Sequence, residues 1–540
     1  NYNDIRLKQI WVPLNHRLNY YKEPNNNLGV DIAYRINPSS NLTLAINPDF
    51  GQIESDPANI NLTAFETYFN EKRPFFLKNM DIFETPIEIF YSRRIGEDSF
   101  GLGEKVENVE RNDTLYNFIT IPTKINVAGK LTGKNENGLS YGLLSALVTE
   151  SDSSKWKNYY NPDTIYYPYK YPKQYFISRV KQDLLSGNSF LGFMSTSSFA
   201  DSNHTFSVDG MANLFENQLS IDGQIIMTLD KYKGIYGSIS YYPYGLYSGW
   251  VDYYYFDKGL NIDELGYLWR DDYTQTKFGL KFQSLEPWNI IRNTSIILEG
   301  DMEKNTDELD LGKSIDIIYD LEFENFWGIG GGFYKIMEYY DDRKIILDYE
   351  RNDFGPSIFI PEINGSHFNI TTNKHRSLWA TIDLTWAQNI RDDSEQMQYS
   401  ELTYKPNTFV SFSTSYSHYL LNKQYHWLET FWEDLDKQYH HIFSSLVRSI
   451  DVLNFRSNYN INRNLSIQGY LEIYSNHDKY SNYTEYSSET NKYDNESSYI
   501  LGLPPVWGNK PLYTTSTDSV DLEISFVDPN LDLQFHPKYT

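Results

Sequence analysis

Hydrophobic and polar residues alternate along most of this chain. The clearest stretch is residues 315–324, in which Ile315, Ile317, Tyr319, Leu321 and Phe323 alternate with Asp316, Asp320, Glu322 and Glu324. Successive side chains of a β-strand point to opposite faces, so a period of two predicts a strand with one apolar and one polar face. We therefore expect Ile317 on the apolar face of a sheet and Asp320 on the polar face.

The same alternation recurs from residue 30 to residue 526. It begins with a hairpin (30–36 and 42–46) and returns at residues 139–147, 219–227, 278–282, 378–386, 453–459, 465–473 and 520–526. Strands of about ten residues with one apolar face are typical of membrane β-barrels. A soluble β-sandwich or propeller also alternates, but the long strands, long polar connections and lack of a fixed repeat favour a barrel. The pattern predicts an all-β fold, a transmembrane antiparallel β-barrel of about 14–18 strands.

Long polar connections rich in tyrosine separate some of the predicted strands. They are residues 150–172, 390–398, 421–446 and 475–519. Outer-membrane barrels have short periplasmic turns and long outer loops, so we expect these four segments to be exposed outer loops. Four of their aromatic side chains are candidate contacts for a partner protein or a glycan: Trp427, Trp432, Tyr480 and Tyr483. The alternative is that these loops only shield the surface.

Residues 47–96 interrupt the alternation after the first hairpin. Phenylalanines and charges are interleaved there, and the charges that stand out are Glu66, Glu71, Arg73, Arg93 and Arg94. This mixture suits contact with a polar inner wall, where each charge finds a partner. We predict a plug-like insertion in the barrel's lumen or mouth, with its arginines paired to strand carboxylates and its glutamates to strand lysines. An ordinary capped turn-and-helix connection is the alternative.

A second group of charges lies at residues 263–272. Its members are Asp263, Glu264, Arg270, Asp271 and Asp272. Carboxylates around an arginine could bind a hard cation or a sugar, but we favour a structural ion network. The histidines lack paired ligand spacing, and no nucleophile elbow, phosphate loop or zinc-protease motif is present. The sequence therefore predicts no catalytic, cofactor-binding or metal-binding residue, and it favours a non-enzyme over an enzyme.

Composition narrows the possible classes of protein. The 540 residues include no cysteine, which excludes disulfides and thiolate metal sites, and no apolar run reaches the length of a membrane-spanning helix. The net charge of -25 disfavours nucleic acid as a partner, because phosphates need a basic surface. Residues 1–28 are polar and rich in asparagine, and we interpret them as a lead-in from an upstream part.

Several long blocks of this sequence resemble one known family. They include NPDFGQIESD (47–56), FETYFNEKRPFFLKNMDIF (65–83), IFYSRRIG (89–96), FDKGLNIDELGYLWRDDY (256–273) and RSIDVLNFRSNYNINRNLSIQGYLEIY (448–474). They are similar to outer-membrane proteins catalogued as domain of unknown function 5916, which usually carry an N-terminal family 9 carbohydrate-binding module. The resemblance implies a β-barrel over residues 29–540 without a settled activity. Family members usually continue past the segment matching residues 528–533, which implies that C-terminal strands are missing here.

These observations lead to one functional expectation and two rivals. We expect a protein of the bacterial outer membrane that is a structural or scaffold component of an envelope complex, or a gated channel. Its partners would be membrane lipid and proteins of that complex, with a glycan as a further candidate and no cofactor. One rival is a surface carbohydrate-binding or carbohydrate-processing protein, and the other is a soluble multidomain β-enzyme.

Overall fold

The computed structural model describes most of the chain between residues 29 and 535. The described ranges are residues 29–48, 64–97, 99–108, 113–121, 123–150, 173–199, 203–243, 245–284, 286–348, 353–433, 438–462, 465–486, 499–500, 506–507, 510–511, 523–526 and 530–535. The predicted lead-in at 1–28 and the connection 151–172 lie outside them, as do residues 49–63 of the predicted insertion. Within the described ranges, no helix combines the length and apolar character that crossing a membrane requires.

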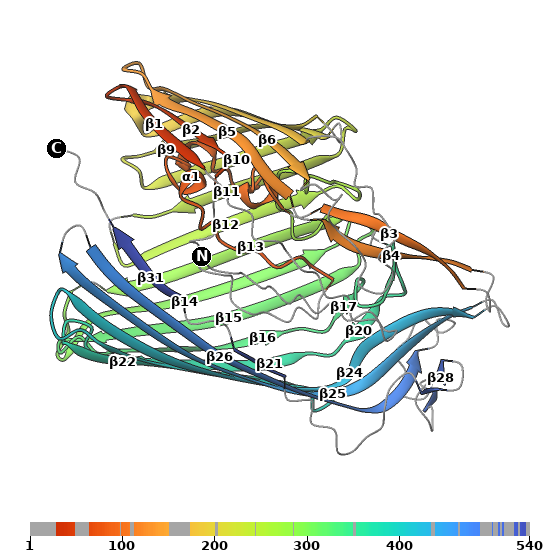
Figure 1. Cartoon of the computed structure of the whole chain (residues 1–540). Coiled ribbons are helices and arrows are strands. Elements are labelled where there is room, and N and C mark those ends of the chain that lie inside the picture. The colour runs from red at the N-terminus through yellow and green to blue at the C-terminus, as the bar shows by residue number, and fades with distance from the viewer. Residues whose placement is uncertain are drawn as a thin grey trace.

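One antiparallel sheet of 23 strands dominates the molecule (Figure 1). Its first strands are β1 (Val30–Asn37), β2 (Ser40–Ile46), β5 (Thr123–Lys134), β6 (Leu139–Glu150), β7 (Lys173–Leu184), β8 (Ser189–Ser198), β9 (Asn203–Leu214), β10 (Leu219–Thr228), β11 (Lys233–Tyr241) and β12 (Tyr247–Phe256). It continues with β13 (Tyr273–Ser284), β14 (Ile291–Lys304), β15 (Asp310–Phe323), β16 (Gly328–Ile336), β21 (Ile363–Thr371), β22 (Leu378–Asn389), β23 (Ser394–Tyr404), β24 (Val410–Glu433), β25 (Gln438–Asn462), β26 (Leu465–Tyr486), β27 (Tyr499–Ile500), β30 (Glu523–Phe526) and β31 (Asn530–Phe535). The predicted all-β class and the hairpin at residues 30–46 are confirmed.

The small elements lie in the connections of this sheet. They are α1 (Pro74–Leu77), η1 (Asp81–Phe83), η2 (Ser92–Arg94), η4 (Leu185–Gly187), the hairpin of β3 (Ser99–Asn108) and β4 (Asp113–Ile121), and the pairs β17 (Tyr339–Asp341) with β20 (Ile358–Ile360), β18 (Ile346–Asp348) with β19 (Asp353–Phe354) and β28 (Val506–Trp507) with β29 (Lys510–Pro511). The elements α1, η1 and η2 belong to residues 47–96, which interrupt the alternation of apolar and polar residues after β2.

The two ends of the sheet differ in the length of their connections. At one end, tight turns join neighbouring strands, as between β1 and β2 or β9 and β10. The opposite end carries the long connections after β2, β12 and β16. The edge strands β1 and β31 both run from the long-connection end to the short-turn end, and among the described pairings none joins them. An antiparallel closure of the sheet would therefore require one further strand between them.

The expected strand number and several expected loops are wrong. The sheet has 23 strands instead of about 14–18. Residues 421–446 are mostly the paired strands β24 and β25, residues 475–486 belong to β26, and residues 390–398 are a short turn that leads into β23. Two β-bulges in β24, between Lys423 and His426 and between Trp427 and Glu429, shift the side-chain parity there. Because of these bulges, apolar and polar residues do not alternate strictly along β24, and this part of the strand was predicted as a loop.

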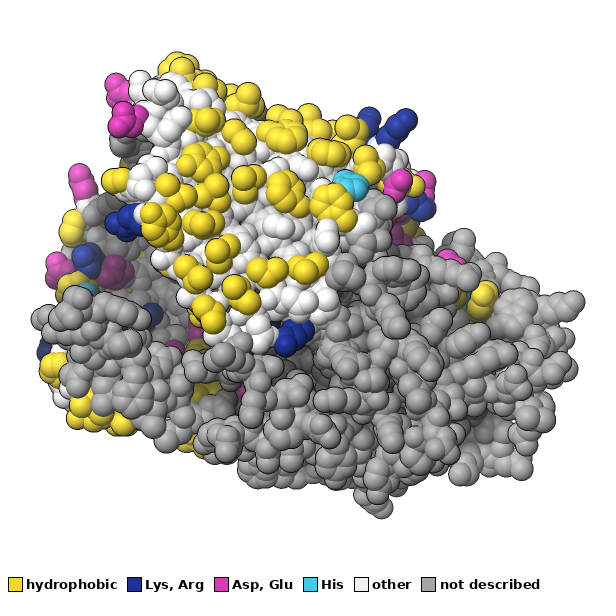
Figure 2. All heavy atoms as spheres, turned by 45° about the horizontal axis from the view of Figure 1, so that its top comes forward, with side chains coloured by type: hydrophobic (Ala, Val, Ile, Leu, Met, Phe, Trp, Pro, Cys, Tyr) yellow, Lys and Arg dark blue, Asp and Glu magenta, His cyan; other side chains and the backbone are white. Residues whose placement is uncertain are grey.

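The two faces of the sheet have opposite chemistry. One register row across β10 to β13 places Ile221, Ile239, Val251 and Phe278 directly opposite one another, each 37–56% exposed. The next row, on the other face, carries Asp222, Ser238, Asp252 and Lys277. Figure 2 shows apolar side chains spread over the outer face of the described strands. α1 lies on the inner side of the curved sheet (Figure 1).

Candidate functional site

Residues 64–97, called the inner segment below, lie against the inner face of the sheet. Pro74 occupies the first turn of α1, where its missing N–H costs nothing. Two short 3-10 turns, η1 and η2, follow the helix, and Gly96 adopts a positive φ of 86°. These tight turns fold the segment compactly enough to fit inside the curve of the sheet.

The apolar side chains of the inner segment form one core with the strands. The segment contributes Phe75, Phe76, Phe83, Ile87, Ile89, Phe90 and Ile95, and the strands contribute Ile125, Ala128, Leu144, Ala146, Ile177, Met194 and Ile226. All of these side chains are at most 7% exposed. Burying such a side chain contributes about 1.5–3 kcal/mol, so this contact is a stable part of the fold.

Polar groups of the inner face bind backbone atoms of the inner segment. The ammonium of Lys130 donates to the Phe75 carbonyl at 2.6 Å and also to the Lys78 carbonyl. Arg179 Nε donates to the Ile82 carbonyl at 3.2 Å, and Gln224 both accepts from Ile87 N–H and donates to the Ile87 carbonyl. Buried cations need such acceptors, so these strands are built to hold this segment.

Arg179 is also tied to a second strand. Its guanidinium forms a bidentate pair with Asp209 on β9, with Nη2 to Oδ2 at 2.6 Å, and both side chains are 2% exposed. An added Cβ at Gly192 would lie 2.6 Å from the guanidinium, so the glycine leaves room for it. One buried arginine therefore joins β7, β9 and the inner segment.

The predicted charges of the inner segment pair mainly with each other. Among the described residues, Arg73 bonds Glu71 at 2.7 Å, and Arg94 bonds Glu66 at 2.5 Å and Glu97 at 3.2 Å. Arg93 donates to the Asn70 carbonyl at 2.9 Å. The expectation that the arginines pair with strand carboxylates, and the glutamates with strand lysines, is wrong for these contacts. The carboxylates in these short contacts, Glu71, Glu66 and Glu97, belong to the inner segment itself, whereas Asp263 of the connection after β12 lies 4.0 Å from Arg94.

Glu71 is the centre of the most enclosed of these pairs. Burial opposes its ionisation, but hydrogen bonds from Arg73 and Ser92 outweigh burial and hold the pKa of the Glu71 carboxyl below its ordinary value. Arg73 also donates to the carbonyls of Ile95 and Ser92, at 2.5 and 2.6 Å. This network fixes the second half of the segment against its first half.

A close approach at Gly142 gives a direct test of the docking. An added Cβ there would lie 2.7 Å from Phe83 Cζ, in the middle of the shared core. We expect Gly142→Val to lower the free energy of unfolding by about 1–3 kcal/mol, because the core would be overpacked. The matched control is Gly237→Val, since an added Cβ at Gly237 meets nothing within 4 Å. Equal unfolding midpoints of the two variants in urea would show that Phe83 does not pack there.

The connection between β12 and β13, residues 257–272, holds the other side of the inner segment. Tyr91 N–H donates to the Leu265 carbonyl at 2.6 Å, and Tyr267 N–H donates to the Glu88 carbonyl at 2.9 Å. Arg94 Nε donates to the Gly266 carbonyl at 3.1 Å. The inner segment is thus clasped between the strand face and this connection.

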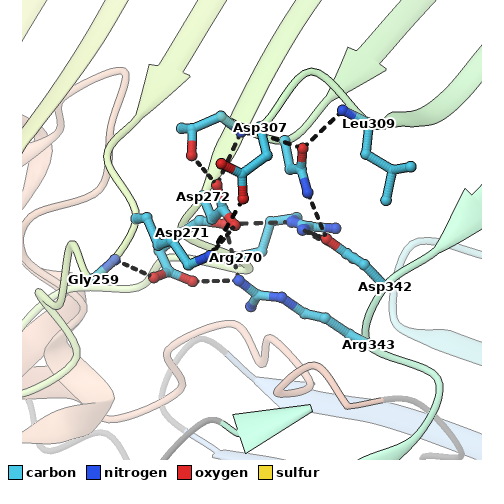
Figure 3. Close-up of polar contacts among 11 residues, drawn as sticks. Gly259, Arg270, Asp271, Asp272, Asp307, Leu309, Asp342 and Arg343 are labelled. Carbon is cyan, nitrogen blue, oxygen red and sulfur yellow. Dashed lines mark hydrogen bonds and ion pairs between the residues drawn. The ribbon is translucent and has the colours of Figure 1, made fainter. Parts of the chain in front are cut away.

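The predicted cluster at 263–272 divides into two places within that connection. Asp263 and Glu264 turn toward Arg94 and Lys173, at 4.0 and 3.5 Å. Arg270 donates to both carboxylate oxygens of Asp342 at 3.0 and 3.1 Å (Figure 3). Next to Asp342, Arg343 donates to the carboxylate of Asp271. Asp272 accepts from Thr306 N–H at 2.9 Å.

These contacts tie three connections together at one end of the sheet (Figure 3). Residues 257–272, 305–309 and 341–343 meet there, and Asn305 donates to Asp342 at 3.3 Å. Because protein donors already occupy the carboxylates of Asp271, Asp272 and Asp342, the geometry favours a structural ion network over a cation or sugar site. In the described part of the chain, no group of three or more metal-ligating side chains is suited to an ion.

The four aromatic loop candidates lie on paired strands. Trp427 is half-buried, bonds Thr430 Oγ1 at 3.1 Å and packs against a second small core of Ile345, Ile358, Phe443 and Tyr486. Tyr480 lies in β26 with its ring centroid 6.3 Å from that of His426. The backbones of Trp432 and Tyr483 belong to β24 and β26, and their side chains lie outside the described atoms.

Sequence reasoning missed the strand residues that hold the inner segment. Lys130, Arg179, Asp209 and Gln224 all occupy inner-face positions, so alternation alone could have marked them as facing inward. Lys130, Arg179 and Gln224 bind backbone groups of the inner segment, which have no sequence signature, and Asp209 pairs with Arg179. The periodic signal therefore gives the direction of these side chains but not their partner.

Comparison with known protein families gives a match. The family model described as a domain of unknown function (DUF5916) matches residues 13–500 of the chain. No curated protein matches it.

Proposed function

Because the chain belongs to the DUF5916 family, whose description names no activity, we propose its function from the geometry alone. We propose a β-barrel of the bacterial outer membrane whose lumen is filled by residues 64–97, serving as a scaffold in an envelope complex. The docked inner segment makes a permanently open pore a poor description of this molecule.

The observation that carries this proposal is the continuous apolar outer face. Outward positions of neighbouring strands are occupied by exposed large hydrophobic side chains, including Leu191, Val208, Ile225, Leu280, Ile296, Ile317, Phe333 and Leu384. A soluble monomer rarely exposes an apolar patch larger than a few hundred Å². Lipid is the solvent that such a face requires, and a polar lumen behind it is the usual arrangement in membrane barrels.

The asymmetry of the two sheet ends supports an orientation. Membrane barrels keep short turns on the periplasmic side and long loops outside. We therefore propose that the turns between β1 and β2 and between β9 and β10 face the periplasm. The connection 257–272 and the ion network around Arg270 would then face outward, where a partner protein could reach them.

Substitution of Ile317 tests the lipid-facing assignment. Ile317 lies opposite Leu298 and Phe333, and all three are exposed on the outer face. We expect Ile317→Arg to destabilise the protein by about 2–4 kcal/mol if it lies near the membrane midplane, because a charge there is placed in hydrocarbon. Asp320→Asn, on the opposite face of the same strand, should be nearly neutral.

The measurement is urea unfolding after refolding into lipid vesicles. A midpoint for Ile317→Arg that equals that of Asp320→Asn would contradict the assigned faces. Equal tolerance would also favour a soluble sheet whose outer face is covered by protein.

A further inference from the structure

The large sheet has two edge strands, β1 and β31, and the gap between them is called the seam below. Among the described pairings, β1 pairs only with β2, and β31 pairs only with β26. Both edge strands run from the long-connection end to the short-turn end, and they lie at the two free ends of the curved sheet (Figure 1). A strand that pairs antiparallel with both must therefore run from the short-turn end to the long-connection end.

The edge strand β1 is exposed over its whole length. All eight of its residues are exposed, whereas only Ile46 is exposed in the neighbouring strand β2. The exposed residues of β1 belong to both faces, with Ile32 on the apolar face and Asp31 on the polar face. About half of the backbone N–H and C=O groups of an edge strand point away from its neighbour, which makes the edge a template for a further strand. In the proposed barrel, hydrocarbon would offer those groups no partner, so the seam requires a strand.

The direction of the missing strand indicates which part of the chain can supply it. A strand that ends at the long-connection end can continue into β1, because β1 begins there. The segment directly before β1 is residues 1–28, which lie outside the described residues. Adjacent strands are only about 5 Å apart, so residues 10–28 more than suffice as a connection. The end of the sheet where they would lie also carries the long connections after β2, β12 and β16. Residues 1–9 can therefore reach the seam.

The start of the chain has the pattern that a wall strand requires. Asp4, Arg6 and Lys8 alternate with Ile5 and Leu7. A period of two predicts a strand with one apolar and one polar face, as in the strands of the large sheet. Such a strand would place its two aliphatic side chains on the outer face and its three charges on the inner face.

Charge complementarity selects one register of this segment against β1. In that register the facing pairs are Lys8 with Asp31, Leu7 with Ile32, and Asp4 with Arg35. Opposite charges directly across an antiparallel pair stabilise it, and like charges destabilise it. A shift by two residues in either direction leaves at most one pair of opposite charges, and a shift by one residue exchanges the two faces.

We propose that residues 4–9 of this chain form the strand that fills the seam, paired with β1 on one side and with β31 on the other. The sequence of β31 has the same alternation, with Leu531 and Leu533 on either side of Asp532. This inference rests on the proposed barrel and deepens it, because it names the segment that closes the wall. The other occupants that the test distinguishes are a strand of a partner protein and a segment that follows β31.

Disulfide crosslinking of the full chain tests the proposal, because the native sequence contains no cysteine. In the proposed register, Leu7 and Ile32 face each other with Cα atoms about 4.5–5.5 Å apart, which suits a disulfide. We expect the variant with Leu7→Cys and Ile32→Cys, folded in detergent and mildly oxidised, to form this disulfide in most molecules. The matched control is Leu7→Cys with Ala33→Cys, because position 33 faces the other side of β1, and few of its molecules should be linked. Mass spectrometry of the trypsin-digested chain measures both yields.

A charge exchange gives a second readout on the same disulfide. Adding Asp31→Lys to the variant with cysteines at positions 7 and 32 should lower the yield, because two lysines would face each other, and adding Lys8→Asp as well should restore it. Equal yields with cysteine at position 32 or 33, or no disulfide with either, would overturn the proposal and leave the seam to a partner's strand or a later segment. The disulfide assay needs neither lipid nor conductance, so its failure is distinguishable from failure of the lipid-facing assignment.

Discussion

Replacing Arg179 by methionine is expected to lower the free energy of unfolding by about 3–5 kcal/mol, the usual loss when one partner of a buried ion pair is removed. The change would leave Asp209 as an unpaired buried carboxylate and the Ile82 carbonyl without its donor. Arg179 joins two strands and the inner segment, so its loss should loosen all three together. Urea unfolding in lipid vesicles, followed by tryptophan fluorescence, measures the effect.

The double variant Arg179→Met with Asp209→Leu is the control for this prediction. It removes both charges, and apolar replacements of buried ion pairs are often neutral or stabilising. We expect it to recover most of the stability that Arg179→Met loses. A single variant as stable as the wild type would mean that Arg179 is solvated in the lumen instead of buried under the inner segment.

Much of the sheet could be predicted from the sequence because its strands obey a simple period. Ile317 faces outward and Asp316 faces inward, as alternation predicts, and the hairpin at residues 30–46 begins and ends close to the expected positions. The alternation works here because one face of the sheet is apolar throughout. Where bulges shift the parity, as between Lys423 and His426, the same reasoning mistook a strand for a loop.

The candidate site was only partly predictable. Interleaved charges and phenylalanines marked residues 47–96 as a compact insertion, and the described residues 64–97 pack against the strands, but the pairing of the charges could not be predicted from the sequence. Glu71 and Arg73 are near neighbours along the chain. Glu66 and Arg94 are far apart along the chain, and the fold of the segment between them, which contains α1 and η1, brings them together. The strand cations bind carbonyl groups, which every residue carries, so no residue type in the segment identifies them.

Removal of residues 57–85 is expected to have the largest functional effect. This deletion takes away α1, η1 and the carbonyls that Lys130 and Arg179 bind. It also removes Phe75, Phe76 and Phe83 from the shared core. In the proposed barrel, the deletion would leave the lumen unfilled, and large membrane barrels with an unfilled lumen conduct ions.

A deletion of the β3–β4 hairpin, residues 99–121, provides the control for chain length. That hairpin forms its own two-stranded sheet and belongs to the same connection between β2 and β5. We expect this variant to behave like the intact chain, because the inner segment and its contacts with β5, β7 and β10 remain.

Single-channel conductance in planar bilayers tests the central claim, that residues 64–97 fill the lumen of a membrane-spanning barrel. The intact protein should insert and show little steady conductance, and the variant lacking residues 57–85 should show large, stable steps. Large open steps from the intact protein that are unchanged by the deletion would contradict the claim and identify the molecule as a simple pore.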